Sequence, residues 1–217
     1  MFHILFLILL ANFASTQDHP AHENAFNNKR SNKPFWRPEN QEKFVILHRC
    51  IFSDNVCHFQ NQYNMNKFKH FLNPKIPIFN ATSALLLDIA DFEAQKYSGG
   101  RLITHYFPAI YGNACIRLTY RWLGTPGDNR QLNIIQQDTQ NRCIFSEIDS
   151  PKYNQKFGWT TINLQLDVDP GEPRFFLEVI YNPRKTIRGE YFILKEFIYG
   201  YGSCSTNDAN NCRILKI

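Results

Sequence analysis

Apolar and polar side chains alternate along several short segments of the chain. In residues 114–123 the even positions are apolar, whereas the odd positions from 115 to 121 hold cysteine, arginine, threonine and arginine. The same two-residue period recurs in residues 159–166 and 175–181. Because successive side chains of a β-strand point to opposite faces, this period predicts strands with one buried face.

The stretch from residue 175 to Cys204 joins two such segments. Residues 191–199 are apolar on both faces apart from Lys195 and Glu196, which is typical of a strand in the middle of a covered sheet. A basic, proline-containing turn separates them from residues 175–181, so we expect the two strands to form a hairpin. Cys204 then needs a partner from earlier in the chain.

Further short apolar runs bounded by turn residues predict about nine or ten strands in total. These runs are residues 44–47, 85–89, 101–107, 132–136 and 143–148. No convincing amphipathic helix and no repeat of fixed period accompanies them. The pattern therefore predicts an all-β sandwich.

The beginning of the chain has the pattern of a secretory signal. An apolar run at residues 4–10 is followed by small residues, and we expect residues 1–16 to be a signal peptide, although its first residues lack lysine and arginine. The run is well short of the roughly 20 residues that span a bilayer. No later stretch approaches that length, so we expect a secreted, extracellular protein without a membrane span.

Residues 17–43 are polar and contain several prolines and asparagines, which predicts a mobile polar leader. Lys29-Arg30 is a candidate dibasic processing site, although exposed pairs of this kind are common. His19 and His22 are better explained as solvated side chains than as metal ligands, because no further ligand is near in the sequence.

The net charge of +5 is mild and its basic residues are dispersed. A nucleic-acid-binding protein concentrates them in a stripe with interleaved aromatic residues. The nearest approach, residues 67–70, is too short for such a site, so we expect no nucleic-acid partner.

The six cysteines predict disulfides. An even number in a chain with a signal peptide favours a disulfide framework, and zinc sites need closely spaced CxxC pairs that do not occur here. Between Cys50 and Cys57 lie turn-forming residues, so a bridge between these two would close a reasonable small loop. The six are Cys50, Cys57, Cys115, Cys143, Cys204 and Cys212.

Two short polar features are candidate sites. Asn80 begins an N-x-T sequon, a candidate glycosylation site in a secreted protein. Asp88, Asp91 and Glu93 are weak candidates for a cation site, because they lack EF-hand spacing and glycine. The polar end of a strand explains them better, so we expect no metal.

Motifs for catalysis are absent from the sequence: there is no G-x-S-x-G, H-E-x-x-H or phosphate-binding loop. In the expected hairpin Glu178 and Glu196 would face each other like the carboxylates of a glycosidase. Pairing with neighbouring basic residues or a solvent-facing position explains them better. We therefore expect no enzymatic activity and no cofactor.

The order of these segments resembles the MAM domain, an extracellular recognition and adhesion module. CIFSDNVCHF at residues 50–59 resembles the C-x-F-E-x-x-x-C signature of that family, and ACIRLTYRWLG at residues 114–124 resembles its C-L-x-F-x-Y-x-x-x-G strand. Later segments, from LNIIQQD to RGEYFILKEFIYGYGSC, resemble the remaining family strands in the same order. The resemblance covers about residues 50–204.

This resemblance implies a jelly-roll-like β-sandwich of two antiparallel sheets over residues 44–205, with a C-terminal tail at 206–217. It also implies the disulfides Cys50–Cys57 and Cys115–Cys204. Cys143 and Cys212 remain, and we predict that they pair with each other, with an intermolecular link as the alternative.

The sequence departs from the family pattern in three respects. His58-Phe59 replaces the tryptophan often found after the second cysteine. Lys195-Glu196 replaces an acidic pair, which weakens any cation site. We also expect a single domain, whereas family members usually belong to larger receptors and proteases.

Two functions compete. The first is a secreted recognition module that binds an extracellular or cell-surface protein, including a second copy of itself, through a sandwich face or loops. The second is a lectin-like domain that binds glycan through exposed aromatic residues, with Trp122, Tyr199 and Tyr201 as candidates.

Overall fold

The computed structural model describes most of the chain after residue 43. The described residues are 44–52, 56–72, 83–90, 96–108, 112–124, 129–137, 141–149, 158–168, 172–185, 189–210 and 212. The expected signal peptide and leader, Asn80, Asp91 and Glu93 lie outside these ranges, and the predictions about them stay predictions.

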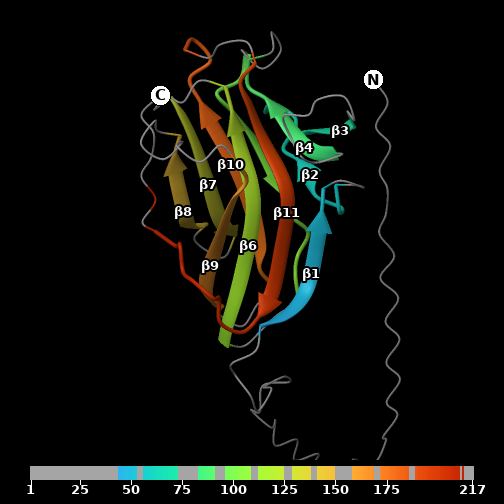
Figure 1. The fold of residues 1–217 in the computed structure, drawn as a ribbon, viewed down its shortest axis with the longest axis vertical. Helices are drawn as coiled ribbons and strands as arrows, with labels where there is room; N and C mark the ends of the chain where they lie inside the picture. Colours follow the sequence, from blue (N-terminus) through green and yellow to red (C-terminus); the bar gives the residue numbers. More distant parts are fainter. Residues whose placement is uncertain are drawn as a thin grey trace, which may run out of the picture. The chain divides into compact units, whose positions relative to one another are not determined.

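The described residues form eleven strands in two antiparallel sheets (Figure 1). Sheet A has the order β3-β4-β11-β6-β9, with β1 also paired to β11, and sheet B has the order β2-β5-β10-β7-β8. The bounds are β1 Val45–Ile51, β2 Gln60–Asn61, β3 Lys69–Leu72, β4 Ser83–Asp88, β5 Gly99–Ile103, β6 Gly112–Leu123, β7 Arg130–Gln137, β8 Arg142–Ile148, β9 Thr160–Val168, β10 Arg174–Tyr181 and β11 Tyr191–Tyr201. The predicted all-β sandwich is confirmed.

The core lies between the sheets and follows the alternation in the sequence. From β10, the alternating apolar residues 175, 177, 179 and 181 are completely buried, and from β6 the even positions 114–120 face them. Phe107 stacks on Phe197 and Tyr199, with ring centroids 5.8 and 4.7 Å apart. Each large apolar side chain buried in this way contributes about 1.5–3 kcal/mol relative to exposure.

Strand β11 occupies the middle of sheet A, as its two apolar faces predict. It pairs with β6 along one edge and with β4 and β1 along the other. Its outer side is apolar at Ile193, which is buried with Ala84 and Leu86. Burial on both faces explains why the strand lacks a polar side at these positions.

The predicted hairpin between β10 and β11 is wrong. Strand β10 pairs with β5 and β7 in sheet B, whereas β11 belongs to sheet A. Tight hairpins use loops of about two to five residues, whereas nine residues separate β10 from β11, and the two strands lie in different sheets. The alternation shows which side of each strand is buried, but not which strand is its neighbour.

The structure contains three disulfides, Cys50–Cys57, Cys115–Cys204 and Cys143–Cys212. These are the pairs expected for the chain. Cys115 was placed by the alternation on the more polar side of its strand, yet it is buried. Its burial follows from the segment that Cys204 holds against the outside of sheet A.

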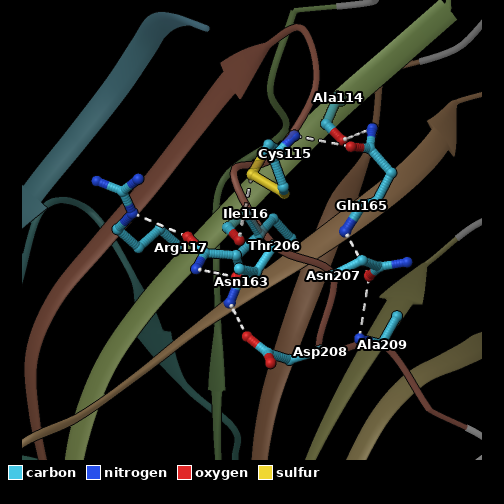
Figure 2. Close-up of a disulfide and its surroundings, with 11 residues drawn as sticks. Ala114, Cys115, Ile116, Arg117, Asn163, Gln165, Thr206, Asn207, Asp208 and Ala209 are labelled. Atoms are coloured by element: carbon cyan, nitrogen blue, oxygen red, sulfur yellow. Dashed lines mark hydrogen bonds between the residues drawn. A yellow bond between two sulfur atoms is a disulfide. The ribbon is translucent and has the colours of Figure 1, made fainter.

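We call this segment the strap: residues 202–210 together with Cys212. After β11 it turns under β6 and runs along the outside of β9 toward β8 (Figure 1). Along β9, the Asp208 N–H donates to the Asn163 carbonyl at 2.7 Å, and the Asn163 N–H donates to Asp208 Oδ2 at 2.8 Å (Figure 2). The Gln165 N–H donates to Asn207 Oδ1 at 3.1 Å. Side chains of the strap thus replace a neighbouring strand.

The strap then reaches the edge of sheet B. The Asn210 N–H donates to the Ile144 carbonyl at 3.3 Å, and the Ser146 N–H donates to Asn210 Oδ1 at 2.8 Å. Asn210 Nδ2 returns a bond to the Ser146 carbonyl at 2.9 Å, and Cys212 is bridged to Cys143 on β8. Part of the expected C-terminal tail therefore covers the edge strands of both sheets on one flank of the sandwich.

Candidate binding surfaces

A row of polar side chains crosses the outer face of sheet B. Glu178 of β10 lies between Arg101 of β5 and Asn133 of β7 in the strand register, and Asn133 lies opposite Ser146 of β8. These residues point outward because their chain neighbours, such as Leu177, point into the core. We call the row the polar belt. Its members are Gln62, Arg101, Glu178, Asn133, Gln131 and Ser146.

Hydrogen bonds link the members of the polar belt. Arg101 Nε donates to Glu178 Oε1 at 3.1 Å, and Arg101 Nη1 donates to Gln62 Oε1 at 3.2 Å. On the other side, Asn133 Nδ2 donates to Glu178 Oε2 at 3.2 Å. Gln131 Nε2 donates to Asn133 Oδ1 at 2.7 Å and also contacts the hydroxyl of Ser146. The belt is therefore a connected network that fixes each side chain.

Part of the polar belt remains open to solvent. The Arg101 side chain is 25% exposed and the Glu178 side chain 10% exposed. The next row of the sheet is apolar, with the half-buried residues Ile103, Phe176 and Ile135 side by side. The guanidinium of Arg101 lies 5.2 Å from the ring centroid of Phe176. This face combines fixed polar groups with an aromatic ring, so it can bond hydroxyl groups and pack against an apolar ring face.

A second charged cluster is buried and serves the fold. Arg130 is completely buried, forms an ion pair with buried Asp149 and lies 4.0 Å from Glu190. Its Nη1 also donates to the Leu123 carbonyl at 2.9 Å. Loss of one partner of such a buried pair strongly destabilises the fold, because it leaves an unpaired buried charge. Because none of its charged groups reaches the surface, the cluster offers no binding site.

The aromatic residues predicted as a glycan site do not form one. Tyr199 is completely buried beside Phe107 in the core, and burial raises the pKa of its hydroxyl. Trp122 packs against Phe192 and lies 5.3 Å from the Arg130 guanidinium. Tyr201 lies at the other end of β11, opposite Ala114 of β6. The prediction fails because the two-residue period cannot distinguish an aromatic residue of the core from one at the surface.

Glu178 and Glu196 do not face each other, and each pairs with an arginine, as the interpretation preferred from the sequence expects of basic partners. Glu178 is ion-paired with Arg101 on sheet B, whereas Glu196 accepts a 2.7 Å bond from Arg49 on sheet A. Asp88 ends β4, where its Oδ1 accepts a bond from the Ala90 N–H at 3.0 Å. Among the described residues, no group of three acidic, histidine or cysteine side chains could hold a metal ion.

Histidines fill the flank opposite the strap. The rings of His48 on β1 and His105 after β5 lie 4.7 Å apart, and both pack against Phe107. His48 Nε2 and His105 Nδ1 are buried without a hydrogen-bond partner. The pKa of His105 is lowered mainly by burial and also by the charge of neighbouring His58. The pKa of His48 is lowered mainly by burial and also by the charges of His105 and His58. Both rings are therefore uncharged at neutral pH. Nothing in the sequence spacing predicts this cluster.

Strand β1 presents a second accessible surface. Val45, Ile46, Leu47 and Ile51 are among the exposed large apolar side chains of the described residues. One edge of β1 pairs with β11, and no described strand pairs with the other edge. We call this free side the outer edge of β1. None of the described residues forms a helix long and apolar enough to cross a membrane.

Known proteins match this chain in fold rather than in sequence. No protein-family model matches it, and no curated protein matches it. The K3 cleaved adhesin domain of Lys-gingipain from Porphyromonas gingivalis superimposes with a TM-score of 0.52 at 10% identity, over 73% of this chain and 100% of that chain. The CBM22-1 xylan-binding domain of Xyn10C from Paenibacillus barcinonensis has a TM-score of 0.45 at 11% identity, over 76% of this chain and 100% of that chain. At such identities the adhesin-domain match shows a shared β-sandwich fold.

Proposed function

We propose that this protein is a secreted recognition module without catalytic activity, and that its ligand is a glycan bound on the outer face of sheet B. The observation that supports this most directly is the polar belt beside Phe176. Sugars present several hydroxyl groups and an apolar ring face. Fixed amide, carboxylate and guanidinium groups next to an aromatic ring complement both features.

Secretion is supported by the cysteines and by the start of the sequence. The described cysteines form three disulfides, and disulfides persist in oxidising compartments. The apolar run at residues 4–10 has the length of the apolar region within a signal peptide. Membership of the MAM family, suggested by the order of the cysteines and strands, is part of the same proposal.

A glycan array probed with the oxidised protein tests the ligand class. We expect binding that is weakened at least about tenfold, equivalent to about 1.4 kcal/mol, by Arg101→Gln or by Phe176→Ala. Arg184→Gln is the matched control, because Arg184 is exposed in the connection between β10 and β11. An array without hits, or equal loss in the control, would contradict the proposal.

A second candidate function is recognition of an extracellular or cell-surface protein. The observation that favours it is the apolar outer edge of β1, which lies on a different part of the sandwich from the polar belt. Co-purification of a protein partner by a variant that has lost glycan binding, Arg101→Gln, would separate the two functions.

A further inference from the structure

The edge strands on the two flanks of the sandwich differ in whether other described residues cover them. On one flank the strap bonds to β9 and β8, and a disulfide holds it near each end. On the other flank, no described residue pairs with the outer edge of β1. Unpaired edges are templates for another strand, and proteins commonly cover them.

On this edge, β1 has backbone groups that bond to no other described residue. The Phe52 N–H donates to the Lys195 carbonyl at 3.0 Å, so it points toward β11. Because backbone groups of successive strand residues point to opposite sides, those of Ile51 and Arg49 point away from β11. They are in position to pair with an added extended segment.

The side chains along the edge are mostly apolar. The exposed fractions are 44% for Val45, 49% for Ile46, 46% for Leu47 and 39% for Ile51. Lysine, proline and inward-pointing charges, which protect natural edge strands, are absent from this strand. An added strand with apolar side chains would bury this surface.

The charge of Arg49 favours an added strand that carries a carboxylate. Its side chain is 55% exposed, and among the described residues it bonds to Glu196 alone, through its Nε. A guanidinium has five N–H donors and can hold a second carboxylate through the remaining ones. Strand β1 itself carries no carboxylate.

We propose that the outer edge of β1 pairs with an extended segment of another protein, and that this segment carries apolar side chains and a carboxylate opposite Arg49. A second copy of this chain fits less well, because two copies of β1 would bring together two arginines and no acid. The net charge of +5 also disfavours self-association.

The size of the edge sets the expected strength. Standard interfaces bury roughly 800 Å² per partner, and a strand of seven residues supplies only part of that area. We therefore expect weak binding that becomes weaker with salt, because the contact between Arg49 and a carboxylate is screened. The site is separate from the polar belt, so it rests on the proposed function only in assuming a recognition module.

Two synthetic peptides test the proposal against the intact, oxidised protein. Both have the length of β1, alternate valine and threonine, and end in proline to limit self-association. One carries two central glutamates and the other two central lysines. We expect the glutamate peptide to bind at least about tenfold more tightly in fluorescence anisotropy, and to protect the amides of β1 in hydrogen exchange.

Three variants make the test specific. Ile46→Glu should weaken the glutamate peptide about tenfold, because it removes an apolar contact and places a charge of the same sign as the peptide on the edge. Arg49→Glu combined with Glu196→Arg keeps the ion pair but moves the positive charge to β11, so it should abolish the preference for glutamate. Tyr63→Lys is the matched control, since Tyr63 is 85% exposed outside β1, and it should bind like the unchanged protein.

Several outcomes would overturn the proposal. These are no binding of either peptide, equal binding of both, or protection confined to strands other than β1. Concentration-dependent dimers that protect β1 without peptide would assign the edge to a second copy instead. Glycan binding through sheet B can succeed or fail independently of each of these results.

Discussion

The flank closed by the strap and the flank formed by β1 differ in how their edge strand is covered. Each ends in an edge strand of sheet A, which is β9 on the closed flank and β1 on the open flank. On the closed flank, asparagine and aspartate side chains of the strap occupy the hydrogen-bonding positions of β9 and β8. On the open flank, no described strand pairs with the outer edge of β1, which carries exposed apolar residues.

The difference shows that edge protection need not come from a strand. The strap forms no strand in residues 202–210, yet it satisfies backbone groups of β9 and β8. It can do so because its two disulfides fix its position, so that short polar side chains reach the edge. The open flank has only the local bridge Cys50–Cys57.

The largest expected effect on stability comes from removing a disulfide, and its size should differ between the two flanks. Replacing Cys115 and Cys204 by alanine removes a bridge across 89 residues, whereas Cys50 and Cys57 are 7 apart. The chain-entropy model predicts losses of about 4–5 and about 2–3 kcal/mol, respectively. Urea unfolding of both double variants measures the free energies, and a larger loss for the short bridge would contradict the comparison.

A hydrogen bond in the core beside the closed flank should have the next largest effect. The Tyr120 hydroxyl donates to the Glu147 carboxylate of β8, and Tyr120 is buried. Tyr120→Phe should cost about 1.5–3 kcal/mol, because it leaves a largely buried carboxylate without this donor. The control Tyr106→Phe, at a 54% exposed side chain, should change the free energy of unfolding by less than about 0.5 kcal/mol.

Acid should affect the two flanks in opposite directions. Burial lowers the pKa of His48 and His105, so the unfolded chain binds protons first, and stability falls as the pH drops below 6.5. Burial raises the pKa of Glu147, so the folded protein binds its proton first. That carboxyl adds stability as the pH falls through its folded-state pKa toward 4.5.

Urea unfolding at pH 7.5 and at about pH 5.5 measures this difference. The variant with His48→Gln and His105→Gln should lose less stability between the two pH values than the unchanged protein. Glu147→Gln should lose more, because the opposing contribution is removed. Identical pH dependence in all three proteins would show that the two flanks do not titrate differently.

The smallest effect concerns one residue of the strap. Asn210 exchanges side-chain bonds with both backbone groups of Ser146 at the surface of β8. Asn210→Ala should cost about 0.5–1 kcal/mol, since exposed hydrogen bonds contribute little. Faster hydrogen exchange confined to β8 is the local signature, whereas faster exchange along β1 would mean that the strap acts beyond its own flank.

The sequence predicts well which side chains are buried, but it predicts poorly which strands lie next to each other. Alternation identifies the core side of β10, and the two apolar faces of residues 191–199 identify a central strand. The same alternation places Glu178 on an outer face, but its partner Arg101 lies on a strand far away in sequence. Sheet order decides such contacts, and it is determined by long-range pairing that a local period does not encode.

The candidate sites were hard to predict for the same reason, because they depend on contacts between segments far apart in the sequence. The sequence offers Tyr199 as one candidate for packing on a glycan, but its position opposite Phe107 puts it in the core. The polar belt was missed because its members come from separate segments with ordinary spacing. The sequence predicts only a C-terminal tail at residues 206–217, whereas asparagine and aspartate side chains within it bond to backbone groups of β9 and β8.

The strap also imposes an order of events on synthesis. Cys143 must wait for Cys212, 69 residues later, and Cys115 for Cys204, 89 residues later. A growing chain that has already formed β8 therefore exposes that edge until the strap emerges and is oxidised. Until then both flanks are open, so the nascent protein is most vulnerable to aggregation just before its long-range bridges close.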